Sequence, residues 1–169
     1  DRVNDVKHVV DAETGRRPDL WVTYVDLDRD RGTAVNGVAV PVDEDRLAVF
    51  DTRELNYERI EVTADFVADP GEAWPPERDV PVWVYVGSAA ARQRYVEGRG
   101  AGQAVIRAGY RNRLEDAFRA RGQSAWRRYQ ETTTPPEVET VEGLRLVRTP
   151  PRGGDRTAGS QTRSGLTAW

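Results

Sequence analysis

The order of strand-like and helix-like segments along the chain constrains its fold more than any other feature of the sequence. Segments with apolar–polar alternation or many β-branched and aromatic residues predict strands at 20–27, 34–42, 57–67 and 80–88. Apolar residues at helical spacing predict helices at 43–55, 89–98, 102–122 and 124–133. Most strands precede most helices, which favours an α+β fold over a doubly wound parallel sheet.

Capping and turn residues set the limits of these segments. Asp43, Ser88 and Ser124 stand at the start of helical segments and are the expected N-caps. Residues 1–19 are polar, and residues 11–19 are turn-like with Gly15 and Pro18, whereas residues 68–79 predict a loop with Pro and Gly.

The chain is long enough for one domain with its own core. It has 169 residues, and we expect the domain to span residues 1–149. Residues 150–169 are rich in Gly, Ser, Thr, Arg and Pro, a composition that predicts a disordered tail.

Composition excludes several classes of function. The chain has no Cys, and His8 is its single histidine, so thiolate chemistry, histidine metal clusters and a Ser-His-Asp triad are not expected. A net charge of −3 gives no basic surplus for nucleic acid or an anionic membrane. No apolar run approaches the ~20 residues of a membrane span, and no signal peptide is visible. We therefore expect a cytoplasmic protein without metal, nucleic-acid or membrane partners, and the sequence indicates no oligomeric state.

The short helix at 43–55 turns acidic residues toward its apolar side. Residues three, four and seven apart share a helix face, so Phe50, Asp51 and Glu54 lie on the same stripe as Leu47. Burial without a partner usually raises the pKa of a carboxyl group, and a carboxyl group with a raised pKa is suited to proton transfer near neutral pH. Equally, Glu54 could be an ordinary helix-end residue paired with a nearby arginine, and Asp51 a structural acceptor.

Residues 35–63 resemble the γ-glutamylcyclotransferase-like family. The family pattern joins an N/W-G-V strand to a short helix with L-x-x-x-D-x-x-E and then to a strand that opens with Tyr-x-Arg. The matching residues here are Asn36, Gly37, Val38, Leu47, Asp51, Glu54, Tyr57 and Arg59. The family's usual Glu-Gly is Glu54-Leu55 in this chain, and the insertion before the tyrosine is shorter.

The resemblance implies a small mixed β-barrel with flanking helices and an enzyme that needs no metal or cofactor. Such an enzyme converts a γ-glutamyl amino acid or amine to 5-oxoproline and a free amine. Glu54 matches the catalytic glutamate and would move protons as general acid and base. Asp51 would support it, and Tyr57 and Gly37 would line the substrate pocket.

One family element has no match in the sequence, the early Tyr-x-x-Gly-Ser loop that holds the substrate. "YVGSAAA" at 85–91 is similar but comes later, and it predicts a strand-to-helix turn with Ser88 as cap. Either the natural start of the chain lies outside this sequence, or the loop has been lost. In the second case the domain would be catalytically inactive and would bind a small ligand or a protein partner.

Two further stretches have simpler interpretations. The glycines of 98–102 predict a helix–helix turn, because no strand precedes them as in a nucleotide-binding fingerprint. The arginine-rich stretch 107–128 is interleaved with Glu115 and Asp116, which is typical of a solvated helix face.

Overall fold

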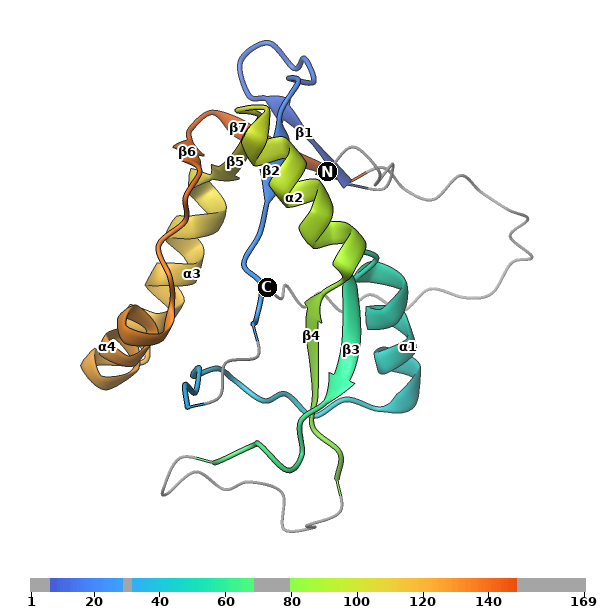
Figure 1. Cartoon of the computed structure of the whole chain (residues 1–169), viewed down its shortest axis with the longest axis vertical. Helices are drawn as coiled ribbons and strands as arrows, with labels where there is room; N and C mark the ends of the chain where they lie inside the picture. Colours follow the sequence, from blue (N-terminus) through green and yellow to red (C-terminus); the bar gives the residue numbers. More distant parts are fainter. Residues whose placement is uncertain (1–6, 29–31, 69–79, 149–169) are drawn as a thin grey trace, which may run out of the picture.

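The computed structural model describes residues 7–28, 32–68 and 80–148, and these residues form a mixed arrangement of helices and short strands (Figure 1). The predicted α+β class is confirmed. The strands are β1 (Lys7–Asp11), β2 (Trp21–Thr23), β3 (Tyr57–Glu61), β4 (Trp83–Gly87), β5 (Ala104–Arg107), β6 (Glu139–Val141) and β7 (Leu144–Arg148). The helices are α1 (Glu44–Arg53), α2 (Ala89–Gly100), α3 (Ala108–Ala120) and α4 (Gln123–Thr132).

The described strands form three separate small sheets, none of them closed into a barrel. Strands β2, β5 and β6 make a parallel sheet with β5 in the middle. Parallel neighbours need crossover connections, and helices α2, α3 and α4 lie in these crossovers. Strands β1 and β7 pair antiparallel, as do β3 and β4.

The core of the described residues lies where the β1–β7 ribbon packs against the parallel sheet. Val9, Val22 and Val105 are buried together, and Leu144 and Leu146 of β7 pack against them. The buried hydrophobic side chains are valines and alanines, and no side chain in the described ranges is less than 2% exposed. The core is therefore small, and large apolar side chains stay partly accessible elsewhere.

The strand predicted at 34–42 is wrong. The described residues 32–42 have no strand, and Val35, Val38 and Val40 are 54%, 48% and 50% exposed. The segment is attached to α4 by a side chain, since Asn36 Nδ2 donates to the Ala125 carbonyl at 2.9 Å. β-Branched residues favour a strand only where an edge is available to pair with, and no edge pairs with this segment.

The single helix predicted at 102–122 is also wrong at its start. Gly102 has φ +67 and follows the end of α2, and residues 104–107 then form β5 between β2 and β6. Helix α3 begins only at Ala108. The sequence "AVIR" is compatible with either structure, and pairing on both sides makes it a strand. Gly98 and Gly100 therefore belong to α2, and Gly102 lies in a helix-to-strand turn rather than a helix–helix turn.

Other boundaries differ in smaller ways. The predicted strands at 20–27, 57–67 and 80–88 are shortened to β2, β3 and β4, and β1 lies in the polar stretch 1–19, whose pattern predicts no strand. Asp43 and Ser88 are confirmed as N-caps, but α4 is capped at Gly122 and not at Ser124. The 69–79 part of the predicted loop and the predicted tail at 150–169 lie outside the described residues.

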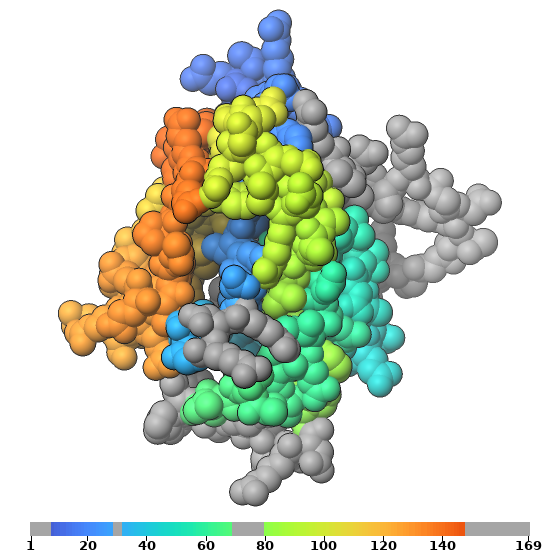
Figure 2. Space-filling view, viewed as in Figure 1, coloured from blue at the N-terminus to red at the C-terminus, as the bar shows by residue number. Residues whose placement is uncertain are grey.

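The arrangement of these elements leaves a broad hollow in the middle of the molecule. Helices α3 and α4 stand on one side, and α2 with the β3–β4 pair stands on the other (Figure 1). Figure 2 shows the opening between them, with atoms of the segment after β2 on its floor. The hollow is lined by residues from β2, α1, β3, β4, α2 and α3, among others.

Candidate functional site

The central hollow is where the sequence-predicted site residues lie. Glu54, Tyr57 and Gly37 all line it, together with Tyr24, Asp26 and Tyr110. The hollow therefore gathers acidic and phenolic side chains from segments far apart in the sequence. Asp51 is not among the lining residues.

Glu54 stands at the C-terminal end of α1. It is the C-cap residue, its backbone N–H donates to the Phe50 carbonyl, and its own carbonyl accepts from Tyr57 N. Its side chain is 23% exposed, and Oε1 accepts from Arg53 Nε at 2.7 Å. The described residues offer no hydrogen bond to Oε2. The carboxylate is thus half-buried at the wall of the hollow, with one oxygen available to a ligand.

Asp51 is positioned for a structural role. Its Oδ1 accepts from the Tyr85 hydroxyl at 2.7 Å and lies 3.3 Å from Arg59 Nε. Partial burial and the hydrogen bond to Asp51 raise the pKa of Tyr85 to about 12, so the phenol stays a donor. Asp51 therefore ties α1 to both strands of the β3–β4 pair, through side chains rather than backbone amides.

Three tyrosines form a connected group beside Glu54. The rings of Tyr24 and Tyr110 meet edge to face, with centroids 5.0 Å apart. Tyr57 donates its hydroxyl to the Val25 carbonyl at 3.1 Å. Burial raises the pKa of the Tyr57 phenol well above its usual range, and the nearby Tyr110, Asp26 and Glu54 add to this. Burial likewise raises the pKa of Tyr110. These phenols are therefore neutral donors at physiological pH.

The segment after β2 is docked onto the end of β4 by Asp26. Asp26 Oδ1 accepts from Gly87 N at 2.5 Å, and Oδ2 lies 3.0 Å from Arg92 Nε. A Cβ at Gly87 would lie 2.5 Å from Asp26 Oδ2, so a larger residue there would push the carboxylate away. Residues 24–28 consequently run along the hollow, close to Tyr57.

Sequence reasoning missed this segment. Residues 24–27 form the end of the strand predicted at 20–27, so the sequence pattern does not mark Tyr24 and Asp26 as site residues. A signal was present in "DLDRD", because a strand seldom continues through several acidic residues. The interpretation of Gly87 and Ser88 as a strand-to-helix turn and cap is confirmed, with Ser88 Oγ accepting from Ala91 N at 3.2 Å.

Gly37 lies in the extended segment on the wall of the hollow. It is exposed, and a Cβ added there would meet nothing within 4 Å. The space beside it can therefore accept part of a ligand, although no steric contact requires glycine at this position.

The described residues were searched for two other features, a metal-binding cluster and a membrane-spanning helix. Among them, no three His, Cys, Asp or Glu side chains gather as they would around a metal ion. Within the same ranges, no helix has the length and apolar character to span a membrane.

Comparison of the chain with family models, with curated proteins and with solved structures finds no match. The resemblance of residues 35–63 to the γ-glutamylcyclotransferase-like family therefore stays a prediction, and the site must be interpreted from its own geometry.

Proposed function

We propose that the chain is a γ-glutamylcyclotransferase-like enzyme that acts on a γ-glutamyl amino acid or amine in the central hollow. The observation that carries the proposal is the position of Glu54, a half-buried carboxylate on the wall of the hollow with Oε2 open to a ligand. It is also the residue that the sequence resemblance marks as the proton carrier. No metal or cofactor takes part in the proposed reaction.

The proposed reaction is an intramolecular aminolysis. Glu54 takes a proton from the substrate α-ammonium, and the free amine attacks the γ-carbonyl carbon. A new carbon–nitrogen bond closes the five-membered ring, and the original amide bond breaks. Glu54 returns its proton to the leaving nitrogen, and the second proton of the ring nitrogen passes to solvent. The product pair is 5-oxoproline and an amine or amino acid. Because attack and leaving groups belong to one molecule, holding the substrate folded supplies much of the rate.

The segment at residues 24–28 supports the proposal as a stand-in for the family's substrate loop. It follows a strand, runs along the hollow, and is held next to Tyr57 by the Val25 carbonyl. Tyr24 and Tyr110 add neutral hydroxyl groups that can orient a polar ligand. The role of Tyr57 is to position this segment, since its hydroxyl is already donated to the Val25 carbonyl.

The small mixed β-barrel belongs to the same proposal. In a barrel of the family type, the exposed extended segment at 34–42 would pair with a neighbouring strand and cover its valines. Amide hydrogen exchange tests this, since barrel closure would protect alternate amides of 34–42 from exchange. Uniformly fast exchange across that segment would contradict a barrel.

A binding module of the same fold is the second candidate, and one observation favours it. Oε1 of Glu54 is occupied by Arg53, the pairing expected of a helix-end glutamate that does no chemistry. An inactive domain would bind a small ligand or a protein partner and release no 5-oxoproline.

Release of 5-oxoproline from a panel of γ-glutamyl amino acids and amines separates the two candidates. Glu54→Gln should lower kcat by about 10²- to 10⁴-fold, the usual contribution of a general acid or base. Glu58→Gln is the matched control, because Glu58 lies four residues away on β3, is exposed, and carries the same charge. Equal rates for wild type and Glu54→Gln would overturn the mechanism, and no release by wild type would favour the binding module.

A further inference from the structure

Arg92 of helix α2 holds the segment that follows β2. Its Nε lies 3.0 Å from Asp26 Oδ2 and donates to the Gly87 carbonyl at 3.2 Å. Its Nη2 donates to the Leu27 carbonyl at 2.9 Å, and its Nη1 donates to Asp28 Oδ1 at 3.1 Å. One guanidinium group therefore ties three consecutive residues of the segment to α2 and to the end of β4.

Arg94 of the same helix holds the turn that follows Glu54. Nη2 of Arg94 donates to Asn56 Oδ1 at 2.7 Å, and this contact is partly buried. The Asn56 carbonyl also accepts from Ser88 N at 2.9 Å, at the N-cap of α2. The turn itself is closed by the hydrogen bond from Tyr57 N to the Glu54 carbonyl at 2.9 Å. Helix α2 therefore fixes the backbone that carries Glu54.

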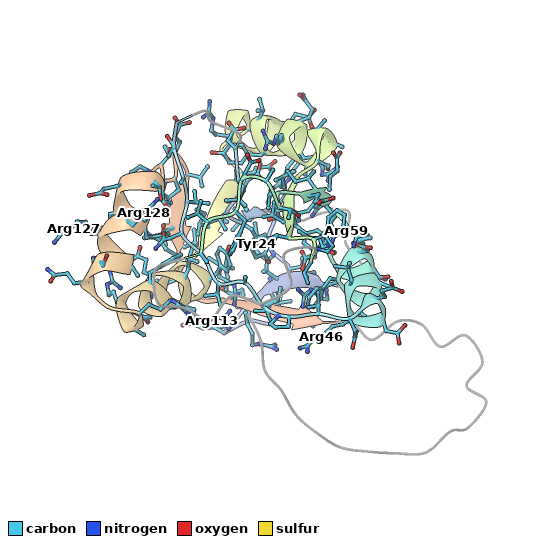
Figure 3. All side chains as sticks on the ribbon, turned by 90° about the horizontal axis from the view of Figure 1, so that it is seen from below. Tyr24, Arg46, Arg59, Arg113, Arg127 and Arg128 are labelled. Atoms are coloured by element: carbon cyan, nitrogen blue, oxygen red, sulfur yellow. The ribbon has the colours of Figure 1, made fainter. Side chains whose placement is uncertain are left out.

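The two arginines thus connect one helix to two separate parts of the site. Side chains two positions apart on a helix leave it on different sides, so Arg92 and Arg94 reach different segments. The two parts also meet each other, since the Tyr57 hydroxyl donates to the Val25 carbonyl at 3.1 Å. Figure 3 shows Tyr24, the first residue of the segment held by Arg92, near the centre of the molecule between α1 and α3.

We propose that Arg92 and Arg94 are positioning residues, which hold residues 24–28 and Glu54 at a fixed separation around the ligand in the hollow. The role of Arg94 rests on the proposed function of Glu54, whereas the role of Arg92 concerns ligand binding alone. Ion pairs as exposed as those of Arg92, whose side chain is 44% exposed, contribute little to stability. A small displacement of the groups around a reacting ligand lowers the rate strongly. The loss of either arginine should therefore affect the site more than the fold.

Gly87 offers a second way to displace the segment while Arg92 stays in place. A Cβ at Gly87 would lie 2.5 Å from Asp26 Oδ2. This oxygen is the end of a flexible side chain on an exposed residue, so it can swing away at little cost in stability. The displaced carboxylate would lose its contact with Arg92. Gly87→Ala should therefore reproduce the effect of Arg92→Gln, and the two changes together should do little more than either alone.

The experiment measures catalysis and binding separately. Release of 5-oxoproline from γ-glutamyl-alanine and from γ-glutamyl-ethylamine gives kcat and KM, and calorimetry in the Glu54→Gln background gives Kd without turnover. Arg99→Gln is the matched control, because Arg99 is an exposed arginine of the same helix whose ion-pair partner is Glu137. Urea unfolding checks that each variant folds. The test variants are Arg92→Gln, Arg92→Lys, Arg94→Gln and Gly87→Ala.

The expected results differ between the two arginines. Arg92→Gln and Gly87→Ala should raise KM and Kd about tenfold and leave kcat within about twofold, because the segment orients the ligand. Arg94→Gln should lower kcat about tenfold with KM nearly unchanged, because Glu54 is displaced. Arg92→Lys should recover only part of the loss, since an ammonium group cannot serve all four acceptors of the guanidinium. Arg99→Gln should change none of these constants.

Each outcome separates the positioning roles from the reaction. Release of 5-oxoproline that is equal in all variants would overturn the positioning roles and leave the proposed reaction standing. Binding that depends on Arg92, without any release, would support the role of Arg92 and refute both the reaction and the role of Arg94. Losses that follow stability alone, in Arg99→Gln as well, would overturn both roles. Neither binding nor release by wild type would overturn both proposals. Arg92→Gln and Gly87→Ala keep the test decisive if Arg94→Gln fails to fold.

Discussion

Helix α2 lies so close to β2 that a single methyl group at Gly98 should destabilise the domain. Gly98 is buried, and a Cβ placed on it would lie 2.8 Å from Trp21 Cε3 and 3.1 Å from Cδ2. Atoms of a rigid indole ring cannot give way independently, and Trp21 is followed by the core residue Val22. Either α2 moves away from the sheet, or the ring leaves its place.

The magnitude follows from two opposing effects. Replacing glycine by alanine inside a helix stabilises by about 1 kcal/mol through helix propensity. Overpacking a close contact typically costs about 1–3 kcal/mol. We therefore expect Gly98→Ala to lower the free energy of unfolding by up to about 2 kcal/mol. With an m-value of about 2 kcal/mol/M, each 1 kcal/mol lowers the urea midpoint by about 0.5 M.

Gly100→Ala in the same helix is the control for this prediction. Gly100 lies two residues further on and is exposed, and nothing lies within 4 Å of a Cβ added there. The propensity gain remains without the clash, so Gly100→Ala should be as stable as wild type or more stable, by at most about 1 kcal/mol. Urea unfolding followed by circular dichroism measures both variants. A Gly98→Ala protein at least as stable as Gly100→Ala would refute the close packing of α2 on β2.

Two further predictions concern charge and capping. Hydrogen bonds from Arg111 and Arg119 hold the pKa of the Glu115 carboxyl below its usual value. The stabilisation that these hydrogen bonds give is present above the ordinary glutamate pKa and is lost as pH falls through the lowered pKa of Glu115. Glu115→Gln should therefore flatten the acid limb of a stability–pH curve. An unchanged acid limb would contradict the pairing of Glu115 with the two arginines. Ser88→Ala should cost about 1 kcal/mol because the cap of α2 is lost, whereas Ser124→Ala, inside the first turn of α4, should cost little in urea unfolding. Equal losses would refute this assignment of caps.

The local signals in the sequence predicted the helices well. Asp43 before an amphipathic stretch predicted α1 and its cap, and Ser88 did the same for α2. Helical period and capping act within a few residues, so the sequence contains the information directly. The inward turn of Glu54 was predicted on the same basis, from its spacing to Leu47, and Glu54 lies half-buried at the wall of the hollow.

Contacts between distant segments could not be predicted from such local signals in the sequence. Tyr24 and Tyr110 stand 86 positions apart in the chain and meet only because β2 pairs with β5, from which α3 departs. Asp26 was assigned to a strand end, and only its contact with Gly87 identifies it as an anchor. No periodicity in the sequence encodes these contacts, since each of them depends on which strands pair.

The sequence by itself determined where α1 and α2 begin, because capping, helical spacing and dipole effects are local. It also determined the α+β class and the absence of cysteine. Tertiary structure decided the strands: residues 104–107 became β5 because two neighbours pair with them, and 34–42 formed none because no edge does. A strand is stabilised by its neighbours, so its existence, and the hollow that the strands and helices enclose, depend on the whole fold.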